Sequence, residues 1–353
     1  MSVPLGAYVH VPFCRSRCEY CAFATWTDRN HLIDDYLEAV RVDIAKTFRT
    51  EIRRVDTVFV GGGTPSLVPA EPLVAALAEI PIVDGAEVTV ECNPDDVTDG
   101  LLATYAAGGV TRISLGVQSM VPRVLELLGR LHDPDNVVRA VESIRRVGFA
   151  SFNLDLIYGT ATETIDEWRS TVKGALMLDP PHISAYGLTV EAGTPLAADP
   201  ARYPDDDIQA EQYELADDLL AAAGLANYEV SNWARRGHQC RHNQLYWRQH
   251  DYLGFGCAAH SHVAGRRWWN VRTPERYVDA VTSGRPTEAA GESLDADSRR
   301  LEALQLSLRT TAGVPRDALD GDALDGLVEP RGDRWVLTRQ GRLLANEVAV
   351  RLH

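Results

Sequence analysis

The sequence contains no apolar run long enough to cross a membrane. Of its 353 residues, 45% are hydrophobic and 24% are charged, which is ordinary for a globular protein. No stretch approaches the roughly 18 consecutive apolar residues of a transmembrane helix. The first residues enter an apolar stretch without a basic leader or a small-residue cleavage site, so a secretory signal is not predicted. We therefore expect a cytoplasmic protein.

Positive charge and cysteine are both scarce. The chain has 35 Lys and Arg against 50 Asp and Glu, a formal net charge of −15. Such a charge repels a phosphate backbone and argues against nucleic acid as a partner. Six cysteines in so long an intracellular chain do not indicate a disulfide framework. A metal or redox role is the better interpretation of those that cluster.

What the sequence does contain is a regular alternation of short β-branched runs with longer amphipathic stretches. This pattern predicts a parallel sheet of six βα units, which right-handed crossovers curl into a partial (βα)6 barrel of TIM type. Ligand groups then belong at the carboxyl ends of the strands. The strands are predicted at 7–11, 55–60, 86–91, 111–117, 151–157 and 182–188, and the helices at 32–49, 70–79, 98–107, 135–147, 164–177 and 206–223.

Beyond this core the rhythm changes, and three parts are predicted. Residues 1–226 form the barrel. Residues 227–290 form an accessory segment, irregular to about 272, rich in aromatic residues, Arg and His, and ending in a linker near 286–291. Residues 291–353 carry a helix at 298–309, a turn and helix at 314–319 and a hairpin-like stretch before a final helix, which predicts a small winged-helix-like domain.

The clearest chemical signal is the spacing C-x3-C-x2-C formed by Cys14, Cys18 and Cys21 after the first strand. Three thiolates can bind three irons of a [4Fe–4S] cube and leave the fourth iron open. S-adenosylmethionine (SAM) can chelate an open iron, so that an injected electron splits its sulfonium. A zinc site is the alternative, although zinc sites usually take four ligands. A homologous fold without any cluster is another.

The placement of these cysteines, with Tyr20 before the third, resembles the radical SAM superfamily. Further segments at predicted strand ends are similar to those that contact SAM in oxygen-independent coproporphyrinogen III oxidases: VGGGTPS (60–66), VECNP, LGVQS, LGRLH and NLDLIYG. Each residue has a structural alternative, such as a carboxylate capping a helix or an amide satisfying the backbone. The resemblance implies that SAM is contacted by Tyr8, Tyr20, Gly62, Gly63, Thr64, Glu91, Gln118, Arg130 and Asp155.

The resemblance also implies individual roles. Glu91 is expected to accept from the ribose hydroxyls, Gln118 to contact the ribose or the carboxylate, and Arg130 to bind the SAM carboxylate. The backbone amides of the glycine-rich segment are expected to pair with the methionine moiety, because glycine lets the main chain approach closely. Tyr8 and Tyr20 are expected around the cluster and the adenine.

Two features decide which relatives the chain resembles most. The oxidases carry a further cysteine two positions after the third, where this chain has Phe23. The stretch HNQLYW at 242–247 matches the HN-x-x-YW motif of the HemW-type haem chaperones. This resemblance implies a protein that binds haem and delivers it to acceptors of the respiratory type, with His242 as iron ligand and with Tyr246 and Trp247 on the macrocycle.

Alternatives stay open around this motif. His242 is a packed core residue in the structural interpretation, and the other candidate ligands are His238, Cys240, His260 and His262. The arginines expected to pair with propionates are Arg235, Arg236, Arg241 and Arg248. A radical SAM enzyme that oxidises, methylates or opens a porphyrin, or acts on another substrate, is the rival function, so enzymatic activity stays undecided. The electron donor is unidentified, and the acceptor is expected to bring any peripheral association with a membrane.

Two segments depart from the relatives' pattern. Gly159-Thr160-Ala161-Thr162 stands where a Gly-x-Pro-Gly-type turn is usual, and Cys257-Ala258 replaces glycine-rich sequence. Both changes are expected to alter loop geometry near the site. Cys92 follows Glu91 directly, so its side chain is expected on the opposite face of the strand, as a small buried residue.

Overall fold

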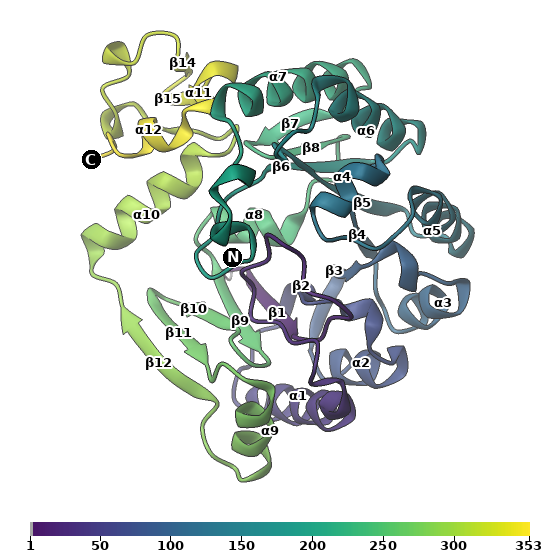
Figure 1. The fold of residues 1–353 in the computed structure, drawn as a ribbon. Coiled ribbons are helices and arrows are strands. Elements are labelled where there is room, and N and C mark those ends of the chain that lie inside the picture. The colour runs from purple at the N-terminus through teal and green to yellow at the C-terminus, as the bar shows by residue number, and fades with distance from the viewer. Residues whose placement is uncertain (1–2) are drawn as a thin grey trace.

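The computed structural model describes residues 3–353. Six strands pair in chain order and in parallel, and helices between them cover the outer face of the sheet (Figure 1). The predicted barrel core is therefore confirmed. Its strands are β1 (Leu5–Val11), β2 (Val55–Gly62), β3 (Ile82–Cys92), β4 (Arg112–Gln118), β5 (Ser151–Tyr158) and β6 (His182–Gly187). Its helices are α1 (Ile33–Thr47), α2 (Ala70–Leu77), α3 (Asp99–Ala107), α4 (Pro122–Leu127), α5 (Pro134–Val147), α6 (Ile165–Met177) and α7 (Asp206–Ala222).

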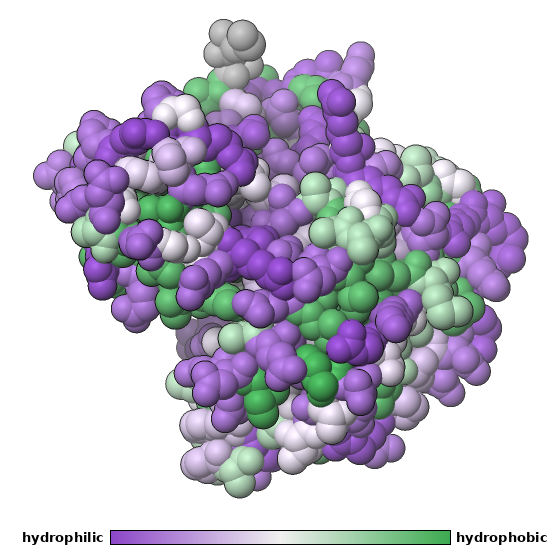
Figure 2. All heavy atoms as spheres, turned by 90° about the horizontal axis from the view of Figure 1, so that it is seen from above, coloured by the Kyte–Doolittle hydropathy of each residue, from purple (hydrophilic) through white to green (hydrophobic). Residues whose placement is uncertain are grey.

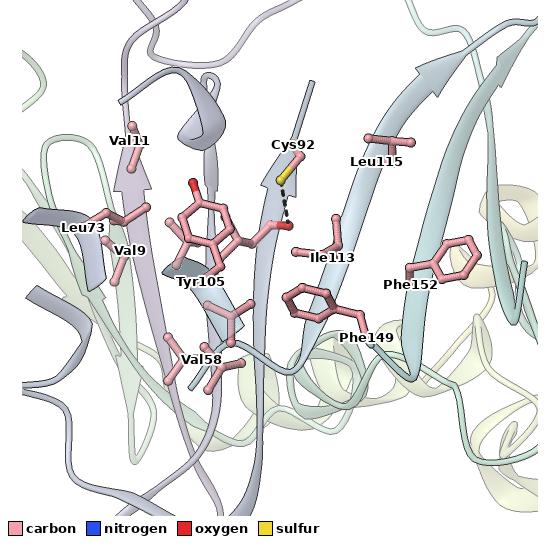
Figure 3. Packing of buried hydrophobic residues seen from close by; sticks show 14 of the residues in the cluster. Val9, Val11, Val58, Leu73, Cys92, Tyr105, Ile113, Leu115, Phe149 and Phe152 are labelled. Carbon is pink, nitrogen blue, oxygen red and sulfur yellow. Dashed lines mark hydrogen bonds between the residues drawn. The ribbon is translucent and has the colours of Figure 1, made fainter. Parts of the chain in front are cut away.

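The two faces of the sheet differ in chemistry. Val9, Val58 and Ile113 belong to the apolar core on the helix side, where each fully buried side chain of this size contributes roughly 1.5–3 kcal/mol (Figure 3). Cys92 lies on the same face, as predicted, with its Sγ 3.9 Å from the carbonyl of Val90. Side chains alternate along a strand, so the inner face carries the polar set Thr57, Glu87, Glu91, Arg112, Ser114, Asn153, Asp155 and His182, all buried or half-buried.

The prediction of an irregular segment after residue 227 was wrong. The chain instead extends the sheet at both edges, with two short strands beside β6 and four strands beside β1, of which the first is parallel to β1. The linker expected at 286–291 overlaps a strand whose six residues are all exposed, so it carries no hydrophobic pattern to reveal it. These strands are β7 (Ala226–Glu229), β8 (Asn232–Ala234), β9 (Asp251–Phe255), β10 (His260–Val263), β11 (Arg266–Asn270) and β12 (Glu288–Ser293).

Helix α8 (Arg241–Trp247) packs against the inner face of β1 and β2. A Cβ on Gly6 would lie 3.2 Å from the methyl groups of Leu245, so the absence of a side chain in β1 admits the helix. Helix α8 therefore fills part of the barrel interior from the side of the sheet that carries the polar residues.

A small C-terminal unit follows α9 (Pro274–Thr282). It combines a three-stranded antiparallel sheet with helices, and it has an apolar cluster of its own that includes Leu308, Val314 and Trp335. The predicted unit is confirmed, whereas the exact boundaries between the three parts stay a prediction. Its elements are α10 (Ala296–Leu308), β13 (Val314–Pro315), β14 (Val328–Arg331), β15 (Arg334–Leu337), α11 (Arg339–Leu343) and α12 (Ala345–Ala349).

The surface agrees with the composition. Figure 2 shows a face covered largely by hydrophilic residues, with hydrophobic residues in scattered groups. Within residues 3–353, none of the helices combines the length and the apolar character needed to cross a bilayer.

Candidate cluster and ligand site

The three motif cysteines lie on the loop that leaves β1. The N–H of Cys14 donates to the carbonyl of Trp26 at 3.0 Å, and the N–H of Trp26 donates to the carbonyl of Pro12 at 2.8 Å, so the loop is closed at its base. All three cysteines are half-buried and carry unbridged thiols. Burial, together with the neighbouring thiols, raises the pKa of Cys14 and of Cys21. A bound iron would reverse this tendency, because a coordinating thiol loses its proton.

The described residues do not form a site for a single metal ion. Within residues 3–353, no three side chains of His, Cys, Asp or Glu are grouped closely enough to hold one. In an iron–sulfur cube each thiolate binds a different iron, so the ligands need not converge on one point. Three unbridged thiols on one anchored loop fit such a cube.

Glycines at the end of β2 bring the main chain against this loop. Gly62 has a φ of +112°, a conformation that favours glycine, and a Cβ on Gly63 would lie 2.7 Å from the carbonyl oxygen of Phe13. The hydroxyl of Thr64 then lies 3.7 Å from the Sγ of Cys14. The glycine-rich segment therefore positions the first cysteine of the triad.

The predicted role of the backbone amides in this segment needs correction. The N–H of Gly62 donates to Glu91 at 3.2 Å, that of Gly63 to the carbonyl of Val11 at 2.8 Å, and that of Thr64 to the carbonyl of Phe13 at 2.8 Å. The reason is that pairing with β1 continues to the last residue of β2, which directs these donors at protein acceptors. Contact of the three residues with SAM stays a prediction, but not through these N–H groups.

Arg130 reaches back over the end of β4 toward the cysteine loop. Its Nη2 donates to the carbonyl of Gly116 at 2.9 Å, and its Nη1 lies 3.7 Å from the Sγ of Cys18. Its Nε is buried without a hydrogen-bond partner among residues 3–353. The side-chain amide of Gln118, whose φ is +63°, lies beside the guanidinium of Arg130 over Gly116. A Cβ on Gly116 would be 3.0 Å from the Gln118 Nε2 and 3.5 Å from the Arg130 Nη2. A buried cation with an unused donor fits an anionic group such as a carboxylate.

Glu91 on β3 and Asp155 on β5 both belong to the polar inner surface of the sheet, with β4 between them. Asp155 accepts hydrogen bonds from Ser114 at 2.8 Å and from Asn153 at 2.7 Å. Burial, and then the charge of Asp155, raises the pKa of Glu91 to about 8. Glu91 is therefore largely protonated at neutral pH in this structure, and a cationic ligand beside it would favour the carboxylate.

The two tyrosines border the cysteine loop. The hydroxyl of Tyr8 lies 3.0 Å from the Nδ1 of His10, and the Nε2 of His10 lies 2.9 Å from the carbonyl oxygen of Ala24. Burial raises the pKa of Tyr20, which also interacts with the charges of Cys18 and Arg130. Most of the residues predicted around the cluster and SAM thus lie on the cysteine loop or at the carboxyl ends of the strands, whereas Tyr8 and Asp155 lie within β1 and β5. Their contact with SAM stays a prediction.

The residues predicted to hold haem are not brought together in the same way. His242 is completely buried: its ring stacks on Phe59 at 5.4 Å, its Nδ1 lies 2.9 Å from the Thr57 hydroxyl, and Tyr246 meets it edge-on at 4.6 Å. Burial lowers the pKa of His242 to about 3, so the ring is neutral. Trp247 instead packs against Tyr228, with ring centroids 5.8 Å apart.

A cavity of about 1030 Å³ opens between the cysteine loop, β10 and the C-terminal helices. Phe23, Tyr246 and Tyr252 form part of its wall, whereas His242 and Trp247 do not line it. Of the alternative ligands, His260 and His262 line the cavity and His238 and Cys240 do not. The predicted haem residues are therefore divided between the cavity wall and the barrel interior.

The arginines predicted for propionates are also elsewhere. Arg235 pairs with Asp179, and Arg241 donates to the carbonyl of Gly85 at 2.7 Å. The cavity is lined instead by Arg267 and Arg309. Arg309 comes from the C-terminal unit, and no sequence signal associates it with the cysteine motif.

Comparison with known proteins agrees with this geometry. Residues 8–174 match the family model of the radical SAM superfamily. The solved structure of coproporphyrinogen III oxidase (HemN) from Escherichia coli superposes with a TM-score of 0.85 at 25% identity, over 99% of this chain and 89% of that chain. The barrel and its cysteine loop thus make the chain a radical SAM protein.

Curated relatives narrow the class further. A Mycobacterium tuberculosis protein named Heme chaperone HemW is 41% identical over 365 residues, which cover 98% of this chain and 94% of that protein. The Escherichia coli protein of the same name is 35% identical over 366 residues, covering 98% and 97%. The chain belongs to the HemW family.

Proposed function

We propose that the protein is a haem chaperone built on a radical SAM core. A [4Fe–4S] cluster on Cys14, Cys18 and Cys21 and a SAM molecule beside it form one site, and haem occupies the neighbouring cavity. The observation that carries the proposal is the cavity of about 1030 Å³, which shares Phe23 with the cluster loop and is large enough for a drug-sized ligand. The names of the relatives support haem as the ligand.

The residues around the cluster divide the work of holding SAM. Arg130 offers its unused Nε–H to the carboxylate, and Glu91 accepts from hydroxyl or ammonium groups once it loses its proton. Gln118 adds an amide beside Arg130. When bound, a reduced cluster supplies the electron that splits the sulfonium of SAM.

Phe23 favours carriage of haem over oxidation of a porphyrinogen. It stands where the resembling oxidases have a further cysteine, and it is 71% exposed on the cavity side of the loop. An aromatic ring here adds apolar surface for a macrocycle and adds no thiol chemistry. The rival is a radical SAM enzyme acting on a porphyrin, and the likeness to coproporphyrinogen III oxidase supports it.

One experiment separates the two functions. The anaerobically reconstituted protein is incubated with SAM, dithionite and coproporphyrinogen III, and a second sample is titrated with haem. We expect a stable haem complex by absorbance and no protoporphyrinogen IX by chromatography. Formation of protoporphyrinogen IX at the rate of a control oxidase would overturn the proposal.

Delivery of the haem requires an acceptor. The names of the relatives support a chaperone but specify no acceptor. We propose a respiratory haem protein as the acceptor, with a cytoplasmic chaperone that associates with the membrane through it. The loaded protein is mixed with membranes depleted of haem, and haem is followed in the pelleted fraction. Transfer that also occurs from haem-loaded albumin at the same rate would contradict a specific chaperone.

A further inference from the structure

We propose that the axial ligand of the haem iron is His262 on β10, and that the macrocycle lies in the cavity between β10 and the C-terminal helices. This inference rests on the proposed function and assigns the residues that perform it. His242, the histidine of the HN-x-x-YW motif, then supports the cavity wall from behind.

His262 has the hydrogen bonding of an iron ligand. Its Nδ1 lies 3.3 Å from the carbonyl oxygen of His250, which can only accept, so Nδ1 carries a proton. Its Nε2 is buried, has no partner among residues 3–353, and therefore keeps a free lone pair, as the Nε2 of His242 also does. The residue is 3% exposed and lines the cavity. A second ring nitrogen held by a backbone carbonyl is the usual arrangement of a ligating histidine.

His242 is less suitable because α8 holds it inside the barrel. A Cβ on Gly6 would lie 3.3 Å from its Cε1, Phe59 covers one face of the ring, and Tyr246 stands edge-on at 4.6 Å. Tyr246 lines the cavity, and His242 is behind it. A macrocycle could reach His242 only if α8 separated from β1 and β2.

The cavity walls have the surfaces that a flat apolar ring requires. Helix α10 contributes Leu306 and Leu308. Helix α12 contributes Ala345 and Ala349, and Val350 directly after it adds a further apolar side chain. Phe23 and Val350 are 71% and 77% exposed, so two large apolar side chains that line the cavity have little cover. Burying such surface against a porphyrin is favourable, and exposed apolar residues at a cavity mark binding sites.

The charges of the cavity match a ligand with carboxylate arms. Arg309 pairs with the buried Glu229 through Nε and Nη2, which leaves its Nη1 for a propionate. Arg267 pairs with Glu292 and Glu302 and is already engaged on both sides of its guanidinium. Arg309 is therefore the arginine that we assign to the propionates of the iron tetrapyrrole.

The test uses the full-length reconstituted protein and haemin as the probe. Wild type, His262→Ala, His242→Ala and the control His31→Ala are titrated and followed by the Soret band and by electron paramagnetic resonance. The control removes an exposed histidine that does not line the cavity. We expect His262→Ala to lose the ligated spectrum and at least tenfold in affinity. His31→Ala should keep the affinity and the spectrum of wild type. His242→Ala should keep the ligated spectrum but bind haemin less tightly, because its ring packs against Tyr246 of the cavity wall.

Imidazole rescue guards against loss by misfolding. If His262→Ala is folded, added imidazole enters the space of the missing ring and restores the ligated spectrum. A wild-type spectrum in His262→Ala, or loss of ligation in folded His242→Ala, would overturn the assignment and leave the chaperone proposal intact. Failure of the wild type to bind haemin would instead overturn the chaperone proposal.

Discussion

The Nη1 of Arg130 lies 3.7 Å from the Sγ of Cys18, so a buried guanidinium borders one of the three thiols of the cysteine loop. The two residues are far apart in the sequence, and the turn after α4 brings them together. A cation in this position stabilises negative charge on the loop and keeps one N–H, the Nε donor, for a ligand. The thiol of Cys18 and the free donor of Arg130 thus belong to one arrangement.

Arg130→Lys tests this arrangement. Lysine keeps the charge but loses the fork that bonds Gly116, faces Cys18 and offers Nε. We expect the variant to retain its iron and to bind SAM at least tenfold more weakly, about 1.4 kcal/mol, as measured by equilibrium dialysis on the reconstituted protein. The control Arg123→Lys changes an exposed arginine that pairs with Glu167 and should leave SAM affinity unchanged. Equal affinities in both variants would contradict the role.

Glu91 makes stability depend on pH. Its pKa of about 8 in the folded state exceeds the value of about 4.3 in an unfolded chain. The folded state therefore binds the proton more tightly, and its contribution to the free energy of unfolding is complete below about pH 4.3 and lost as the pH rises to about 8. Within this window the change is at most about 1.4 kcal/mol per pH unit.

Glu91→Gln should remove that dependence. Melting temperatures of the protein without SAM are compared at pH 6 and pH 8.5 for the wild type, for Glu91→Gln and for the exposed control Glu71→Gln. We expect the drop in melting temperature toward pH 8.5 to be smaller in Glu91→Gln alone. An identical drop in all three proteins would show that Glu91 ionises normally.

The barrel could be predicted because its signal is local. The run at 151–157, for example, has apolar residues that alternate toward the helices, and β5 covers 151–158. The strand β12 could not be predicted, since all its residues are exposed and it forms only by pairing with β11. The helix α4 was missed because its six residues are too short a run to show the helical period of apolar residues.

The site could be predicted in part. The residues expected near the cluster follow strand ends, and parallel strands place such ends at one edge of the sheet. The complete burial of His242 could not be predicted, because the sequence HNQLYW does not specify which side of α8 faces the barrel interior. That choice depends on Gly6 and Phe59, which contact His242 from strands distant in the sequence.

Ala258 stores strain at the edge of the cavity. Its φ is +56°, a left-handed conformation that costs a non-glycine residue roughly 1–2 kcal/mol. Glycine loses more conformational freedom on folding than alanine does, which offsets roughly 0.5–1 kcal/mol of this gain. We expect Ala258→Gly to raise the free energy of unfolding by about 0.5–1 kcal/mol in a urea titration. The control Ala221→Gly, on the exposed face of α7, should lower it by about 1 kcal/mol. Equal losses in the two variants would contradict the strain.

Phe23 provides the sharpest link between the cluster loop and haem. Its ring lines the cavity and is 71% exposed, so a bound macrocycle would bury much of it. Phe23→Asp removes that apolar contact and places a negative charge near an anionic ligand, and both effects weaken binding. We expect haemin affinity to fall about tenfold, or 1.4 kcal/mol, with iron content unchanged. Phe23→Leu keeps an apolar side chain and should lose much less. If Phe23→Asp bound haemin as tightly as Phe23→Leu, the macrocycle would have to lie away from the cluster loop.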